Sequence, residues 1–263
     1  MKLMVAAFAL TIALAAAPSS GYAAYEKANA LFVAKRFPEA SEAVEEALRL
    51  DSKLVPALTL KAKLAMAANN FDLASRCLDQ ALAVDPNAFY AQFLYGLEAY
   101  LSNDMTEALS RFRKAHRLHP AYPNATLYLG LATESVGQTA DALSLYAEAV
   151  KLERSAGTLR AETLLPGARL LFLLDRLDES ERSTREAVKL APNSRDARFE
   201  LARLLLKKGD AAEAAAEGET ALGLSDGVVT DAAIHYLLIR AWQQCQRPDR
   251  AAVHAAIIRA QGN

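Results

Sequence analysis

Apolar residues recur at intervals of three and four along most of the chain, and short polar stretches interrupt them at regular distances. Leu58, Ala62 and Ala65 illustrate the spacing, which places apolar side chains on one face of an α-helix. A polar pair at 69–70 follows this stretch, and another at 103–104 follows the next apolar stretch. Such pairs are typical of the turn between two antiparallel helices. The pattern therefore predicts a series of helix-turn-helix units.

Small residues return with a period of 34 residues. In each of the first four copies, two alanines stand seven residues apart in the predicted second helix, and hence on one of its faces, where a neighbouring helix can approach closely. Pro86 and Pro120 follow at matching positions, where proline ends a helix. A period of this length indicates a solenoid, because no single copy can bury its apolar face alone. The alanines are Ala40, Ala74, Ala108 and Ala142, with Ala47, Ala81, Ala115 and Ala149.

Two short insertions shift this register, the first at 157–160 and the second at 229–231. After the first, Ala168 and Ala187 fill the small positions again, and after the second Ala251 does so in a degenerate last copy. We therefore predict an all-α fold of about seven antiparallel helix-turn-helix repeats. Their predicted ranges are 24–54, 55–88, 89–122, 123–156, 161–194, 195–228 and 232–263.

The repeat resembles that of the tetratricopeptide repeat (TPR) family. The segment 87–120 carries the best single match, with Gly96 in the small position of its first helix and Ala108, Ala115 and Pro120 in its second half. The resemblance extends over nearly all of residues 24–263. It implies a right-handed superhelical solenoid whose first helices line a concave groove for an extended or helical peptide.

The first residues form a segment of a different kind. Lys2 gives it a positive start, an apolar run continues from Leu3 to Ala17, and small residues stand at Gly21 and Ala23. This order is typical of a signal peptide, and it predicts cleavage after Ala23. The apolar run is shorter than the roughly 20 residues that span a bilayer, so no stable membrane span is expected. We predict an exported protein, either periplasmic or secreted from the cell.

Charge and composition narrow the classes of partner. The net charge is −1 and 52% of the residues are hydrophobic. The hydrophobic content is ample for folding, and a chain without a basic stripe is not expected to bind nucleic acid. The two cysteines, Cys77 and Cys245, fall five repeats apart, too far for the short Cα separation of a disulfide, and we expect both to be buried helix residues.

We find no motif that indicates an enzyme. The chain has no phosphate-binding glycine loop, no Gly-x-Ser-x-Gly elbow and no His-Glu-x-x-His pair. His116 and His119 lie three residues apart, but no third ligand stands near them, and a basic residue at the end of a helix is expected on capping grounds. No cofactor and no metal ion are predicted.

The resemblance also implies which residues meet a partner. By its register, the second, fifth, ninth and twelfth positions of each copy face the groove. They are mostly aromatic or apolar in the early copies, whereas three later copies carry arginine in the ninth position. Such a groove would hold apolar side chains along its first half and acidic residues, or a free carboxylate, along its second. The candidate residues are Tyr25, Phe32, Tyr90, Phe93, Leu97, Tyr100, Leu127, Leu131, Arg169, Phe172, Phe199, Arg203, Lys207, Tyr236 and Arg240.

The sequence thus predicts a non-catalytic scaffold that binds a partner protein or peptide in its groove, for example during assembly of an envelope complex. A carrier of a small ligand, or an accessory subunit of an enzyme complex, is the alternative. A compact pocket lined by convergent polar groups would favour the alternative, and a long open groove would favour the scaffold. The oligomeric state stays open.

Overall fold

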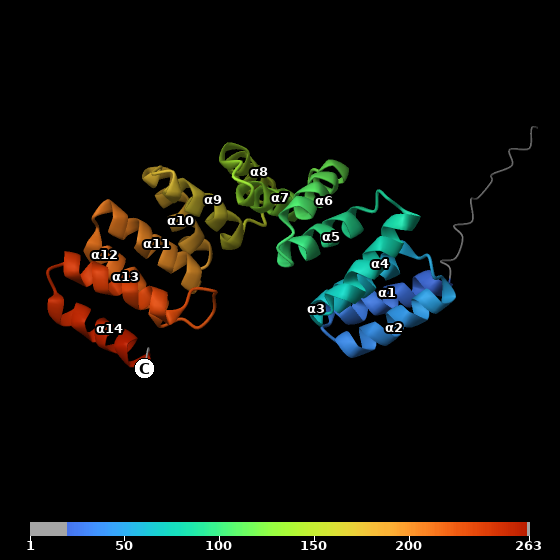
Figure 1. Ribbon diagram of the computed structural model, residues 1–263, viewed down its shortest axis with the longest axis horizontal. Helices are drawn as coiled ribbons and strands as arrows, with labels where there is room; N and C mark the ends of the chain where they lie inside the picture. Colours follow the sequence, from blue (N-terminus) through green and yellow to red (C-terminus); the bar gives the residue numbers. More distant parts are fainter. Residues whose placement is uncertain (1–19, 262–263) are drawn as a thin grey trace, which may run out of the picture. The chain divides into compact units, whose positions relative to one another are not determined.

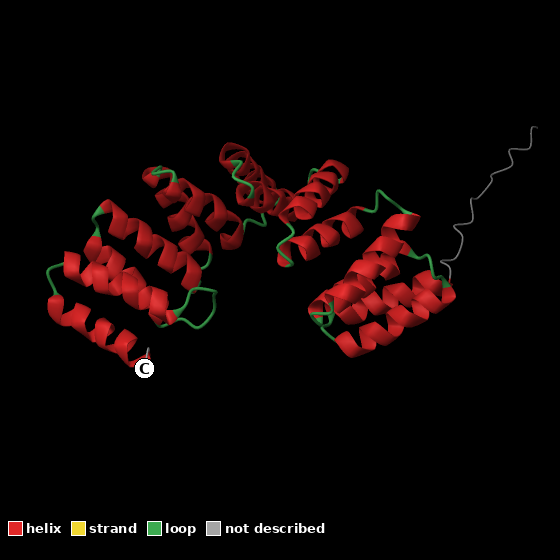
Figure 2. Ribbon diagram, in the orientation of Figure 1, coloured by secondary structure: helices red, strands yellow, loops and turns green. Residues whose placement is uncertain are grey.

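A computed structural model describes residues 20–261 of the chain, and these residues form fourteen α-helices and no strands (Figures 1 and 2). The prediction of an all-α repeat fold is confirmed. The helices are α1 Ser20–Val33, α2 Phe37–Leu50, α3 Val55–Ala67, α4 Phe71–Val84, α5 Phe89–Leu101, α6 Met105–Leu118, α7 Pro123–Ser135, α8 Thr139–Ser155, α9 Ala161–Leu173, α10 Leu177–Leu190, α11 Arg195–Lys208, α12 Ala211–Leu222, α13 Asp231–Gln244 and α14 Pro248–Gln261.

The chain divides into two compact units, the first ending at Glu98 and the second beginning at Ala99, inside α5. The repeat pattern of the sequence predicts no boundary at this point. In the first unit α1 packs on α2, α2 on α3 and α3 on α4. In the second unit each helix from α6 to α13 packs on the next one along the chain, ending with α13 on α14. Each unit is therefore built from helix pairs stacked in chain order.

The turn inside every pair contains one residue in the left-handed backbone conformation. This conformation ends a helix by letting backbone N–H groups reach back to its last carbonyls. After α3, for example, the N–H of Asn70 donates to the carbonyl of Ala65 at 2.8 Å. The seven left-handed residues are Lys35, Asn69, Asn103, Gly137, Asp175, Gly209 and Gln246. The first four stand 34 residues apart, and the wider intervals after them coincide with the two insertions.

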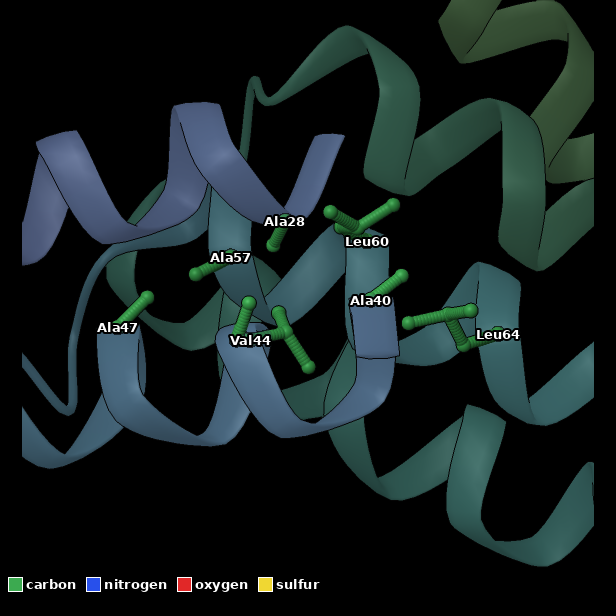
Figure 3. Close-up of a cluster of buried hydrophobic side chains, with 8 residues drawn as sticks. Ala28, Ala40, Val44, Ala47, Ala57, Leu60 and Leu64 are labelled. Atoms are coloured by element: carbon green, nitrogen blue, oxygen red, sulfur yellow. The ribbon is translucent and has the colours of Figure 1, made fainter. Parts of the chain in front are cut away.

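The alanines with the 34-residue period lie at the closest packed positions of the fold. All eight of them, in α2, α4, α6 and α8, are completely buried. In the first unit, Ala40 and Ala47 of α2 pack with Ala28 of α1 and Leu60 of α3 (Figure 3). Small side chains let these helices approach, while larger residues on the same faces fill the remaining space.

The predicted signal peptide lies largely outside the described residues. Residues 20–23 form the first turn of α1, and Gly21 is buried there. Cleavage after Ala23 stays a prediction. The two cysteines are free: Cys77 is buried, as expected, but Cys245 is only half-buried because it caps the end of α13.

Gly130 on α7 gives one test of the packing. A Cβ atom added there would lie 2.7 Å from Cε1 of the buried Tyr146 ring, so we expect Gly130→Ala to destabilise the second unit by about 1–3 kcal/mol. Gly223 is the matched control. It has a φ of −75°, and no atom would lie nearer than 3.5 Å to its added Cβ. Gly223→Ala should therefore be neutral or stabilise by up to about 1 kcal/mol. Urea unfolding measures both, and equal losses would contradict the packing.

Candidate functional site

A pocket of about 430 Å³ opens on the second unit, where the first helices of successive pairs supply its walls. The end of α5 contributes an aromatic ring, α7 and α9 contribute both apolar and charged groups, and α11 contributes an arginine. The pocket thus combines an apolar surface with groups of both charges. Its lining residues are Tyr100, Leu131, Glu134, Ser135, Pro166, Arg169, Leu173 and Arg203.

The carboxylate of Glu134 is fixed in this pocket by a buried tyrosine. The Tyr146 hydroxyl on α8 donates to Oε2 of Glu134 at 2.5 Å. Burial, followed by this hydrogen bond, raises the pKa of Tyr146 well above its usual value, so the hydroxyl keeps its proton. The ring fits because Gly130 on α7 has no side chain: a Cβ atom added there would lie 2.7 Å from Cε1 of the ring. A buried residue therefore orients one acceptor of the pocket.

The charge of Arg203 is already partly engaged within the protein. Its Nη2 atom lies 2.7 Å from Oε2 of Glu200, and its guanidinium lies 4.4 Å from the centre of the Phe172 ring. Burial raises the pKa of the Glu200 carboxyl, and the charges of Arg203 and Arg169 oppose this rise. Stacking on an aromatic face holds the guanidinium plane in one orientation. The Arg203 guanidinium therefore lines the pocket in a fixed orientation, with its charge partly neutralised by Glu200.

Arg169 is the cation that remains available. It is exposed on α9, and it makes no salt bridge or side-chain hydrogen bond within residues 20–261. Tyr100 and Glu134 share the pocket with it, and Leu131 and Leu173 supply apolar surface. A carboxylate could therefore pair with the guanidinium by two hydrogen bonds while an attached apolar group contacts the leucines. This arrangement can bind a carboxylate that carries an apolar group. Among the residues that line the pocket, no nucleophile is paired with a base.

The other residues predicted for the second half of the groove lie around the pocket or away from it. Phe172 is half-buried beneath Arg203, and Lys207 pairs with Asp175 at 2.8 Å. Phe199 packs against the core of α11 to α13. Leu127, which was predicted for the first half of the groove, is 8% exposed, lies in the core and presents little surface to a partner. Tyr236 and Arg240 are both exposed on α13, and neither lines the pocket.

A second pocket, of about 580 Å³, lies in the first unit between α1, α3 and α5. Tyr25 and Tyr90, two of the candidate groove residues, line it together with Phe89. Phe32 is half-buried, with the Lys63 ammonium 4.4 Å from its ring centre. The remaining two residues predicted here present less surface. They are Phe93, 6% exposed in the core, and Leu97, which is half-buried.

The comparison with protein families agrees with the architecture. The model described as "Tetratricopeptide repeat" matches residues 2–54, 59–123, 99–158 and 165–228, which together make up most of the chain. The chain belongs to the tetratricopeptide repeat family. Its fold therefore supports a role as a protein-protein interaction scaffold, the general role of TPR proteins, which are mostly non-catalytic.

Solved TPR structures show the same fold at low sequence identity. The crystal structure of the APC/C hetero-tetramer Cut9-Hcn1 matches with a TM-score of 0.72 and 15% identity, over 85% of this chain and 43% of that one. A tetratricopeptide repeat protein from Parabacteroides merdae matches with a TM-score of 0.65 and 17% identity, over 93% of this chain and 94% of that one. YrrB, described as a TPR protein with an unusual peptide-binding site, matches with a TM-score of 0.59 and 20% identity, over 78% of this chain and 99% of that one. This TPR chain spans less than half the length of the first of these. No curated protein sequence matches it.

Sequence reasoning missed the acidic group of the pocket. Glu134 occupies the twelfth position of its repeat, one of the four predicted to face the groove, but only aromatic, apolar and basic residues were selected there. Its hydrogen bond with Tyr146 could not be anticipated, because it depends on how α7 and α8 of the TPR stack pack around Gly130. Among the described residues no group of three or more potential ligand side chains is arranged to hold a metal ion. No helix of residues 20–261 has the length and apolar character to cross a membrane.

Proposed function

We propose that this TPR protein is a scaffold that binds a peptide segment of a partner protein, and that the pocket of the second unit holds an acidic side chain or the free carboxylate of that segment. The observation that carries the proposal is the position of Arg169. It is an exposed guanidinium that forms no ion pair with any residue from 20 to 261, and it is set among apolar side chains in a pocket. A charge in such surroundings binds a carboxylate more strongly than a fully solvated arginine does.

The polar groups beside Arg169 support a peptide rather than a bare anion. Glu134 has a second carboxylate oxygen that can accept a hydrogen bond from a peptide N–H, and Ser135 adds a hydroxyl. Leu131 and Leu173 provide room for an apolar side chain next to the acidic one. A segment in which an acidic residue follows an apolar one therefore fits the pocket chemistry.

The partner and the compartment are part of the same proposal. The N-terminal segment supports export, and we infer a periplasmic or secreted protein that takes part in assembling a complex of the cell envelope. A carrier of a small carboxylate is the second candidate. It is favoured by the convergence of Arg169, Glu134 and Tyr100 on one compact pocket. N-terminal sequencing of the exported protein tests the cleavage site, and a first residue of Ala24 is expected.

Selection from a library of random displayed peptides tests the proposed function. We expect the chain from residue 24 onward to select peptides enriched in aspartate or glutamate, with an affinity that falls as the salt concentration rises. Free acetate and succinate serve as small-ligand competitors, and a carrier would bind them as tightly as it binds the peptides. Selected peptides without acidic residues would contradict the pocket assignment, and no selection at all would contradict the scaffold.

A further inference from the structure

A buried polar cluster joins the last three helices of the second unit, away from the pocket. His235 on α13 and His254 on α14 are 5% and 7% exposed, and their Nδ1 atoms lie 2.9 Å apart. The Nε2 atom of His254 lies 3.2 Å from Oε1 of Glu219 on α12. The Trp242 indole N–H donates to the same oxygen at 3.3 Å. Titratable side chains therefore link α12, α13 and α14.

The short contact between the two rings limits how many protons they can hold. A hydrogen bond between ring nitrogens requires one N–H and one lone pair. With His254 donating through Nε2 to Glu219, the pair can accept one extra proton, because the His254 ring then carries the charge and His235 accepts through Nδ1. A second extra proton would bring two N–H groups and two positive charges face to face. The docked pair therefore holds one extra proton and excludes the second.

The charges that face His235 do not remove this limit. Asp231 lies one turn earlier on α13, but its carboxylate is held in an ion pair by the buried Arg195 of α11. The Glu219 carboxylate contacts the His254 ring, which lies between it and His235. Burial, followed by the charge of His254, lowers the pKa of His235, and Asp231 and Glu219 only oppose that change.

We propose that His235, His254 and Glu219 form a protonation-controlled latch, which holds α14 against α12 and α13 at neutral pH and releases it in acid. When α14 is released, both imidazoles reach water and bind protons near pH 6.5. The released state then binds one proton more than the docked state. Docking is therefore at full strength above about pH 6.5 and weakens as the pH falls below that value.

The size of the pH effect on docking follows from the one proton that the released state binds and the docked state does not. Between pH 7.5 and pH 5.5 the released fraction of α14 should rise about tenfold. Release would leave the end of the second unit open to another helix, so acid would change what the last repeat can bind. The latch does not depend on the peptide pocket, and it would stand if the proposed function failed.

Hydrogen exchange of the whole protein at pH 7.5 and 5.5 measures the released fraction, after correction for the intrinsic exchange rates. We expect the amides of α14 to lose about tenfold in protection at the lower pH. Those of α2 serve as the reference, because residues 1–98 contain no histidine. A change of less than twofold in α14, or an equal change in α2, would overturn the proposal.

Two asparagine variants separate the latch from general acid effects. His235→Asn keeps a polar group near the Nδ1 position but cannot ionise, so α14 should lose its response to pH. His116→Asn, the matched control, removes a half-buried histidine that contacts Thr126 and should leave the response unchanged. A response retained in His235→Asn would overturn the latch. If that variant does not fold, ring NMR of the unmodified protein decides. If both rings gain a proton near pH 6.5 while α14 stays protected, the proposal is equally overturned.

Discussion

Replacing Leu238 with alanine should destabilise the second unit by about 2–5 kcal/mol. Leu238 on α13 is 0% exposed and packs with Leu201, Leu205 and Ile234 between α11, α12 and α13. Its Cδ2 atom would lie only 2.9 Å from a Cβ atom added at Gly218, so α12 is packed closely against it. The variant leaves a cavity that these helices cannot close without losing other contacts. Urea unfolding followed by circular dichroism measures the loss.

Leu173→Ala is the matched control for this substitution. Leu173 ends α9 and is 68% exposed, so the same chemical change should alter the free energy of unfolding by less than about 0.5 kcal/mol. Losses of similar size in the two variants would show that the core of the second unit does not lie between α11, α12 and α13.

Arg169→Glu should weaken the binding of an acidic library-selected peptide by at least about tenfold. A hydrogen-bonded pair between a guanidinium and a carboxylate contributes about 1.5–3 kcal/mol, and the reversed charge adds repulsion to that loss. The side chain is exposed and forms no ion pair within the part of the chain that the structure describes, so stability should change little. Isothermal titration at two salt concentrations measures the change in affinity and its electrostatic part.

Arg240→Glu makes the same change of charge outside the pocket. It lies on α13, exposed and away from the pocket lining, and it should reduce affinity by less than about threefold through long-range electrostatics alone. If both variants lost affinity equally, the arginines would act as a diffuse positive surface, and the pocket would not be the site.

The repeat could be recognised from the sequence because its physical requirements recur at fixed positions. Ala40, Ala74, Ala108 and Ala142 must each be small where two helices approach, and all four are completely buried. The turns are less regular in sequence. Asn69 and Gly209 favour the left-handed conformation, whereas Lys35 and Gln246 adopt it only because the helices on either side require it. Tertiary packing thus completes a pattern that residue preferences alone leave incomplete.

The site was less predictable because it depends on contacts between repeats. The repeat register treated Arg169 and Arg203 as equivalent groove residues, and both line the pocket. Glu200, three residues before Arg203 on the same helix, engages Arg203, while Arg169 has no such neighbour. That spacing is visible in the sequence and could have separated the two. The position of Glu134 could not have been fixed in this way, since Tyr146 reaches it from another helix.

The most direct test of the proposed function is a double-mutant cycle between Arg169 and the acidic residue of a selected peptide. The four affinities combine Arg169 or Arg169→Glu with a peptide that carries glutamate or lysine at the selected position. If the two groups pair in the pocket, the lysine peptide should recover affinity in the variant, with a coupling energy of more than about 1 kcal/mol. Losses that simply add, with no recovery, would contradict carboxylate binding at Arg169.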